Sequence, residues 1–105
     1  MVKKDNVKQK HIKVVDERYT LPSKKGGGII KIEAWEDLSG NLIKYNIAYI
    51  NHSIFQKDNG RVLGYDNAHG YHHKHFFGKI TALDNFVSYE KLIELFENEI
   101  KDYIK

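Results

Sequence analysis

All the strand-like segments of this chain come before its only helical segment, and this order constrains the fold most. Alternating apolar and polar residues mark five segments, at residues 10–21, 29–36, 42–50, 61–66 and 72–80. Clusters rich in glycine, asparagine and aspartate separate them, and no helical segment lies between any two. Strands joined without helical crossovers pair antiparallel, so the sequence predicts an α+β fold with a meander of about five strands.

Turn and cap residues add detail to this prediction. Asn59-Gly60 is the strongest short hairpin signal, because a type I′ turn requires positive φ at both central residues. Ser88 opens the helix, where its hydroxyl can accept from a free amide of the first turn. An apolar stripe at three-to-four spacing predicts that this helix packs on one face of the sheet. The stripe consists of Leu92, Ile93, Phe96, Ile100, Tyr103 and Ile104.

The composition is that of one small soluble domain. The chain has 105 residues, 41% of them hydrophobic and 30% charged, which predicts a single domain over residues 1–105 with a flexible, lysine-rich start at 1–9. The absence of cysteine excludes disulfides and thiolate metal sites. No apolar run resembles a signal peptide or could span a membrane, so we expect no membrane contact and a cytoplasmic location. The net charge of +3 is lower than dedicated nucleic-acid-binding proteins usually carry.

Residues 61–79 are rich in titratable side chains, whereas segments that only build a scaffold mainly bury apolar ones. Four of the six histidines lie there, at positions 69, 72, 73 and 75. On an extended strand His73 and His75 share a face about 6–7 Å apart, while His72 and Lys74 point the other way. We expect His73 and His75 to be partly exposed, because protonation at working pH requires water or an acidic neighbour.

Two imidazoles at this separation fit acid–base cleavage of RNA. That reaction needs a base for the 2′-hydroxyl, an acid for the 5′-oxygen and a cation for the phosphorane charge. His73 and His75 are the candidate acid–base pair, because histidine titrates near neutrality. Lys74 or Arg61 would supply the cation, and Asp66 would orient an imidazole.

The same histidines also fit a metal site. His73 and His75 could bind one ion, with His69, Asp66 or His52 completing the shell. The spacing of the histidines matches no zinc motif with an established mechanism, so we expect no tightly held ion and no cofactor. Histidines also cluster at exposed turns without any function, which keeps a purely structural explanation open for each of them.

This stretch is similar to a known family. Gly64-Tyr65-Asp66-Asn67-Ala68-His69-Gly70 and His72-His73-Lys74-His75-Phe76 resemble the centre of the TumE-like proteins, small prokaryotic proteins described as the toxin half of toxin–antitoxin pairs. Phe86-Val87-Ser88-Tyr89-Glu90 resembles the start of their closing helix. The resemblance covers most of the chain from about Ile12 onward. The matching positions are Tyr65, Asp66, Asn67, Gly70, His73, Lys74 and His75.

The resemblance implies a toxin with a helix-turn-helix antitoxin encoded nearby, and it leaves the activity undefined. Lys74 stands where the family more often has arginine, which keeps the charge and loses the bidentate fork for phosphate. Our first hypothesis is therefore a metal-independent ribonuclease. Its catalytic residues would be His73, His75 and Asp66, and its substrate-binding residues Lys74, Arg61, Tyr65 and Asn67.

Two alternatives from other classes remain. The first is a non-enzymatic module that binds protein or nucleic acid within a regulatory pair. The second is a metal site of structural or hydrolytic use, with His69, His73 and His75 as ligands. RNA is a candidate partner of the ribonuclease and of the binding module. A homodimer is compatible with all three hypotheses.

Overall fold

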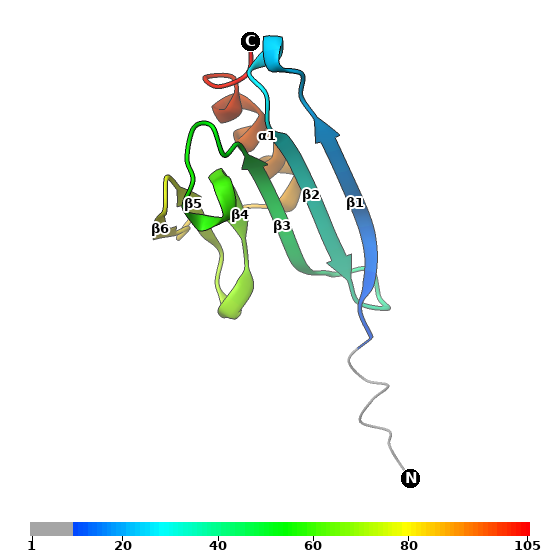
Figure 1. Ribbon diagram of the computed structural model, residues 1–105. Coiled ribbons are helices and arrows are strands. Elements are labelled where there is room, and N and C mark those ends of the chain that lie inside the picture. Colours follow the sequence, from blue (N-terminus) through cyan, green and yellow to red (C-terminus); the bar gives the residue numbers. More distant parts are fainter. Residues whose placement is uncertain (1–9) are drawn as a thin grey trace.

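The computed structural model describes residues 10–105, which form one sheet and one α-helix (Figure 1). Each strand pairs antiparallel with the next, so the sheet order is β1-β2-β3-β4-β5-β6. This confirms the predicted α+β meander, with one strand more than expected. The prediction that residues 1–9 are flexible lies outside the described residues. The elements are β1 (Ile12–Thr20), β2 (Ile29–Glu36), β3 (Leu42–Ile50), β4 (Arg61–Asp66), β5 (His73–Phe76), β6 (Lys79–Ala82) and α1 (Tyr89–Ile100).

The additional strand arises because the predicted strand 72–80 turns back on itself. Phe76 pairs with Lys79, and the two residues between them have positive φ, 48° at Phe77 and 82° at Gly78. Positive φ at both central residues suits a two-residue hairpin turn, because its twist matches that of the flanking strands. Phenylalanine rarely adopts this conformation. Here its ring packs against those of Phe55, Phe76 and Tyr103, which offsets the strain.

Asn59-Gly60 lies in a tight turn, as predicted, but a two-residue hairpin does not join the strands there. β3 ends at Ile50 and β4 begins at Arg61, so residues 51–60 form a longer loop. Its base is closed by the amide of Asn51, which donates to the carbonyl of Gly60 at 2.8 Å. The tight turn lies at the end of this loop, with φ of 53° at Asp58, 56° at Asn59 and 80° at Gly60. The turn therefore places Asp58 directly before β4 instead of joining two strands.

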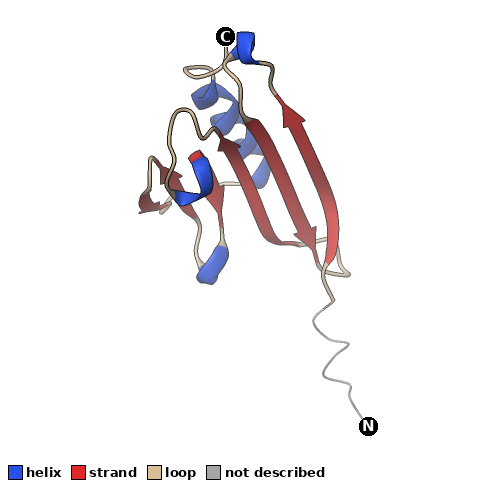
Figure 2. Cartoon of the chain, in the orientation of Figure 1, coloured by secondary structure: helices blue, strands red, loops and turns tan. Residues whose placement is uncertain are grey.

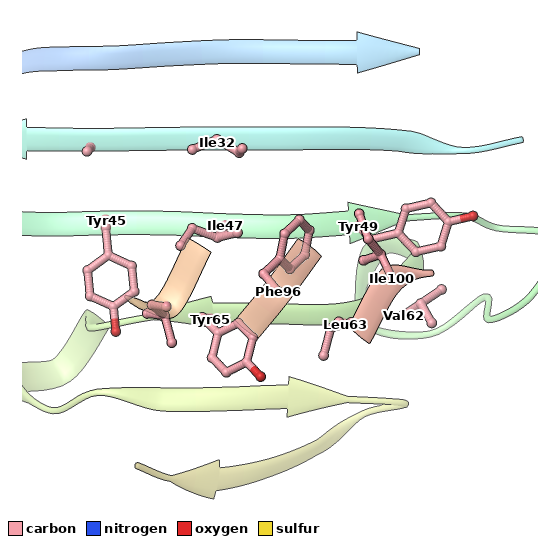
Figure 3. Close-up of a cluster of buried hydrophobic side chains, with 11 residues drawn as sticks. Ile32, Tyr45, Ile47, Tyr49, Val62, Leu63, Tyr65, Phe96 and Ile100 are labelled. Carbon is pink, nitrogen blue, oxygen red and sulfur yellow. The ribbon is translucent and has the colours of Figure 1, made fainter. Parts of the chain in front are cut away.

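The core lies between the sheet and α1. Alternation along β3 sends the side chains of Tyr45, Ile47 and Tyr49 to one face, where all three are fully buried. Figure 3 shows Phe96 and Ile100 of α1 over these strands. The predicted cap is present, since the Ser88 hydroxyl accepts from the Lys91 amide at 3.1 Å. Buried Leu92, Phe96 and Ile100 confirm that the helix packs by its apolar stripe.

The opposite face of the sheet has no α-helix over it in the described part of the chain (Figure 2). We call this surface the open face. It carries mainly polar side chains, because alternation along β2–β5 sends the other positions to the core. Its members include Lys31, Glu33, Trp35, Asn46, Asp66, His73 and His75. Within residues 10–105, no helix has the length and apolar character needed to cross a bilayer.

Candidate functional site

Asp66, His73 and His75 form one group on the open face. In the β4–β5 ladder Asp66 pairs with His73, and Gly64 pairs with His75, so the three side chains leave the sheet at adjacent positions. Asp66 Oδ1 lies 2.8 Å from His73 Nε2, and Asp66 Oδ2 lies 3.1 Å from His75 Nε2. The imidazole centroids are 4.9 Å apart, closer than the strand rise alone suggests. The predicted shared face of the two histidines is thus confirmed, and one carboxylate bridges them.

The prediction that these histidines are partly exposed is wrong. His73 is 4% exposed and His75 is 6% exposed. Residues 72–80 do not form the single predicted strand, because β6 doubles back and pairs Ala82 with His73 and Ile80 with His75. The ring of Tyr71 adds cover, with its centroid 4.6 Å from that of His73. Of the two conditions for protonation, water or an acidic neighbour, the structure provides the second, which is Asp66.

His73 faces two hydrogen-bond acceptors. Its Nδ1 lies 3.0 Å from the carbonyl oxygen of Tyr71, and its Nε2 faces Asp66. Carbonyl and carboxylate oxygens only accept hydrogen bonds, so a neutral ring can donate to one of them and the imidazolium to both. The ring is therefore fixed in orientation whichever form it takes.

His75 has a different environment. Its Nδ1 and Nε2 are buried and lack a hydrogen bond of good geometry, although carboxylate oxygens of Asp58 and Asp66 lie 3.5 and 3.1 Å away. Burial, and next the positive charge of Arg61, lower the pKa of His75, while Asp66 and Asp58 act in the opposite direction. The neutral imidazole is the form that can accept a proton, so His75 suits the role of a base.

Arg61 connects this group to the loop before β4. A Cβ on Gly64 would lie 2.6 Å from Arg61 Cδ, so the arginine stem crosses the strand where a side chain is missing. Arg61 Nε and Nη2 donate to the two oxygens of Asp58 at 3.1 and 3.0 Å. Its Nη1 donates to Asp66 Oδ2 at 3.3 Å. The guanidinium thus lies beside the carboxylate that bridges the histidines.

Lys74 and Tyr65 lie on the opposite face, as alternation predicted for Lys74. Lys74 Nζ is 2.7 Å from Glu99 Oε2 on α1, and the Tyr65 hydroxyl donates to Glu99 Oε1. Burial, with the Glu99 hydrogen bond second, raises the pKa of Tyr65. The structure does not bring either side chain to the histidines. Both connect the sheet to α1.

The remaining predicted residues are also apart from the histidine group. Asn67 accepts from the Tyr45 amide at 3.1 Å and donates to the Ile43 carbonyl at 3.0 Å, which ties the end of β4 to β3. His69 is exposed in the turn that follows, with φ of 64°. His52 is exposed in the loop before β4.

Among the described residues, the group able to hold a metal ion is Asp66, His73 and His75, whose ligand atoms lie within 4.8 Å of one another. His69, named in the predicted alternative set, is not part of it. Two imidazoles and one carboxylate are a ligand set that divalent transition metals accept. The positive charge of Arg61, 3.3 Å from Asp66 Oδ2, opposes a cation there.

Two hollows meet on the open face next to this group. One of about 270 Å³ is lined by Glu33, Trp35 and Lys44, and the other of about 230 Å³ by Lys31 and Asp58. Asn46 and Arg61 line both, so the two hollows adjoin, with Asp66 on the wall of the first and Asp58 on the wall of the second.

Sequence reasoning missed Asp58, Asn46 and Gly64 as parts of the site. Asp58 carried only a turn signal, Gly64 had no motif beyond the family pattern, and Asn46 stood out only as a polar strand position. The Oδ1 atom of Asn46 is buried without a partner, which no sequence pattern indicates.

Comparison with known families decides the broader assignment. The family model described as Toxin TumE matches residues 2–104. The chain belongs to the TumE toxin family. This confirms the resemblance over nearly the whole chain and makes the protein a toxin of a toxin–antitoxin system, with an antitoxin as its partner. No curated protein and no solved structure gives a significant match. The roles of single residues in this TumE family member therefore rest on geometry.

Proposed function

We propose that this toxin acts on RNA as a small metal-independent ribonuclease. The observation that supports this function best is the bridging of two imidazoles, 4.9 Å apart, by the carboxylate of Asp66. His75 would take the proton from the 2′-hydroxyl, whose oxygen then attacks the phosphorus. His73 would give a proton to the departing 5′-oxygen, which leaves a 2′,3′-cyclic phosphate and a free 5′-hydroxyl.

Of the two cations considered, Arg61 is the better candidate for the phosphate contact. Its guanidinium lies beside Asp66, whereas Lys74 lies on the opposite face with Glu99. A planar guanidinium offers paired donors to two oxygens of one phosphate, as the charge on the phosphorane requires. Asp66 would hold both imidazoles in orientation.

Substrate reaches these residues only after a local movement, since both histidines are buried. Besides the paired strand β6, the histidines are covered by the Tyr71 side chain and by the loop 51–60, neither of which belongs to a strand. Loops of this kind open more readily than paired strands do. The described conformation is therefore the closed form of the proposed enzyme.

The test uses histidine-to-asparagine substitutions, which preserve a polar side chain in a buried position. Purified His73→Asn and His75→Asn should lose RNA cleavage by about 10²–10⁴, the usual cost of removing a general acid or base. His69→Asn is the matched control, because His69 is exposed, has positive φ that asparagine tolerates, and lies apart from the group. Cleavage should persist in chelator and yield 2′,3′-cyclic phosphate ends.

Wild-type cleavage or toxicity by folded His73→Asn and His75→Asn would end the ribonuclease proposal. The non-enzymatic binding module would then replace it. Melting temperature and far-UV circular dichroism, recorded for every variant, separate a loss of chemistry from a loss of fold.

A metal centre at Asp66, His73 and His75 is the second candidate, favoured by the closeness of their ligand atoms. Stoichiometric zinc in protein purified without a nickel column, surviving chelator, would establish it in place of the metal-free mechanism. Activity that chelator abolishes and one added metal restores would lead to the same conclusion.

We also propose that the antitoxin is a helix-turn-helix protein encoded nearby and that the toxin acts in the cytoplasm. The family assignment supports the existence of an antitoxin partner. Co-expression with the neighbouring reading frame should relieve toxicity, and the two proteins should copurify. Size-exclusion chromatography of the toxin alone would test for a homodimer.

A further inference from the structure

We propose that Asp58 occupies a phosphate-binding site of this protein, formed by the guanidinium of Arg61 and Nδ1 of His75. A phosphodiester group of RNA would enter when the Asp58 carboxylate leaves. This inference rests on the proposed function for its ligand, and it adds the location of the phosphate and the group that blocks it.

The carboxylate of Asp58 makes the contacts that a phosphate would make. Its two oxygens accept from Arg61 Nη2 at 3.0 Å and Arg61 Nε at 3.1 Å, a bidentate arrangement. Arginine binds two oxygens of a phosphate with the same paired donors. The Oδ2 atom also lies 3.5 Å from His75 Nδ1. An anion in this position would therefore touch both the cation and the proposed base.

The side chains that form the site, Arg61 and His75, belong to strands of the sheet and are held in place by their neighbours. The stem of Arg61 lies across Gly64, where a Cβ would come within 2.6 Å of it. Asp66 fixes the third nitrogen of the same guanidinium at 3.3 Å. The imidazole of His75 is 6% exposed, and neither of its nitrogens has a well-formed hydrogen bond. Buried polar atoms without partners are rare in folded proteins, and a bound oxyanion would supply the missing partner.

Asp58 can leave without disturbing the sheet. It belongs to the loop 51–60 and not to a strand, and its side chain is 26% exposed. Because this carboxylate is partly open to solvent, an external anion can reach the guanidinium and compete with it. The hollow of about 230 Å³ beside it is lined by Asp58 and Arg61 and has Lys31 on its wall, so an anion can approach from the open face.

The experiment compares phosphate binding by wild-type protein and Asp58→Asn, using inorganic phosphate and the ring resonances of His75. Asparagine keeps the positive φ of 53° and removes the charge. Because a competing internal anion lowers the fraction of competent protein, Asp58→Asn should bind phosphate about tenfold more tightly or better. Asp84→Asn, an exposed residue outside the site, makes the same change in net charge and should bind as the wild type does.

Two further variants make the test decisive. Arg61→Lys in the Asp58→Asn protein keeps the charge and removes the fork, so it should lose most of the gained affinity. Asp58→Gly, which also tolerates positive φ, repeats the test if the asparagine variant folds poorly. Equal phosphate affinity in wild type and both Asp58 variants would overturn the proposal.

The source of the phosphate is resolved by competition. A single-stranded RNA with a 2′-O-methyl group on every sugar, which has no 2′-hydroxyl to attack the phosphorus, should displace inorganic phosphate from Asp58→Asn. Failure of the RNA to compete would refute the assignment of the site to RNA. Cleavage assays with His75→Asn test the ribonuclease separately, because phosphate binding at Arg61 is measured without any reaction.

Discussion

Gly64 determines where Arg61 can lie, and adding one methyl group tests this. In Gly64→Ala the new Cβ would meet Arg61 Cδ at 2.6 Å and the Ile47 carbonyl oxygen at 3.1 Å. The arginine must move, so we expect a loss of about 1–3 kcal/mol in the free energy of unfolding, the range typical of overpacking. Urea denaturation of wild type and variant measures this loss.

A double-mutant cycle assigns that loss to Arg61. In an Arg61→Ala background the same glycine substitution should cost less, because its main obstacle is gone. A penalty of equal size in both backgrounds would show that the Ile47 carbonyl, and not the arginine, requires the glycine.

The histidines predict how stability depends on pH. Burial lowers the pKa of His75 and of His72 below the ordinary 6.5. Below about pH 6.5 the unfolded chain therefore binds more protons than the folded one, and the stability present above that pH is lost on acidification. The free energy of unfolding should fall between about pH 7.5 and 5.5 and level off above that range. His75→Asn should reduce this slope, whereas His69→Asn should keep it. A slope of opposite sign would contradict the placement of His75.

At the residue scale, the sequence could predict what depends on strand alternation. It gave His73 and His75 a common face and placed Lys74 on the other. It could not predict that Arg61 reaches Asp66, because this depends on an empty position at Gly64 and on a register shift between Tyr49 and Ile50. Such irregularities arise from tertiary packing rather than from local propensity.

Among the elements, α1 depends on the residue that caps its N-terminus. The hydroxyl of Ser88 accepts from the Lys91 amide, so Ser88→Ala should lower the free energy of unfolding by about 1 kcal/mol. Ser88→Asp restores an acceptor and should recover most of that loss. Chemical denaturation of the three proteins provides the measurement, and a neutral alanine variant would show that packing alone sets the start of the helix.

The order and type of the elements were predictable from periodicity, while one hairpin was not. The turn between β5 and β6 uses Phe77 with φ of 48°, and no turn preference indicates phenylalanine there. Its conformation is compatible with the fold because the ring contacts Phe55 and Tyr103, residues distant in sequence. Asn59-Gly60 forms the predicted tight turn, but this turn stands at the end of a longer loop, which the hydrogen bond from Asn51 to Gly60 closes.

At the scale of the whole molecule, α1 covers only part of the sheet. It packs on β3 and β4, whose helix-facing side chains are buried, whereas β1 has no buried residue along its length. Backbone amides of β3 and β4 should therefore exchange hydrogen most slowly, and those of β1 much faster. Hydrogen-exchange mass spectrometry can resolve these segments. Equal protection of β1 and β3 in the isolated toxin would require some cover over β1 that the fold does not supply.

The meander also affects how the nascent chain behaves on the ribosome. Because neighbours in sequence are neighbours in the sheet, the strands can pair one after another as they emerge. Side chains that contact Tyr45, Tyr49 and Tyr65 come from α1 and the residues on either side of it, a segment that is synthesised after all six strands. The growing polypeptide therefore carries an uncovered tyrosine-rich surface throughout synthesis of the sheet. Any protein that binds this surface must therefore do so before the helix closes over it.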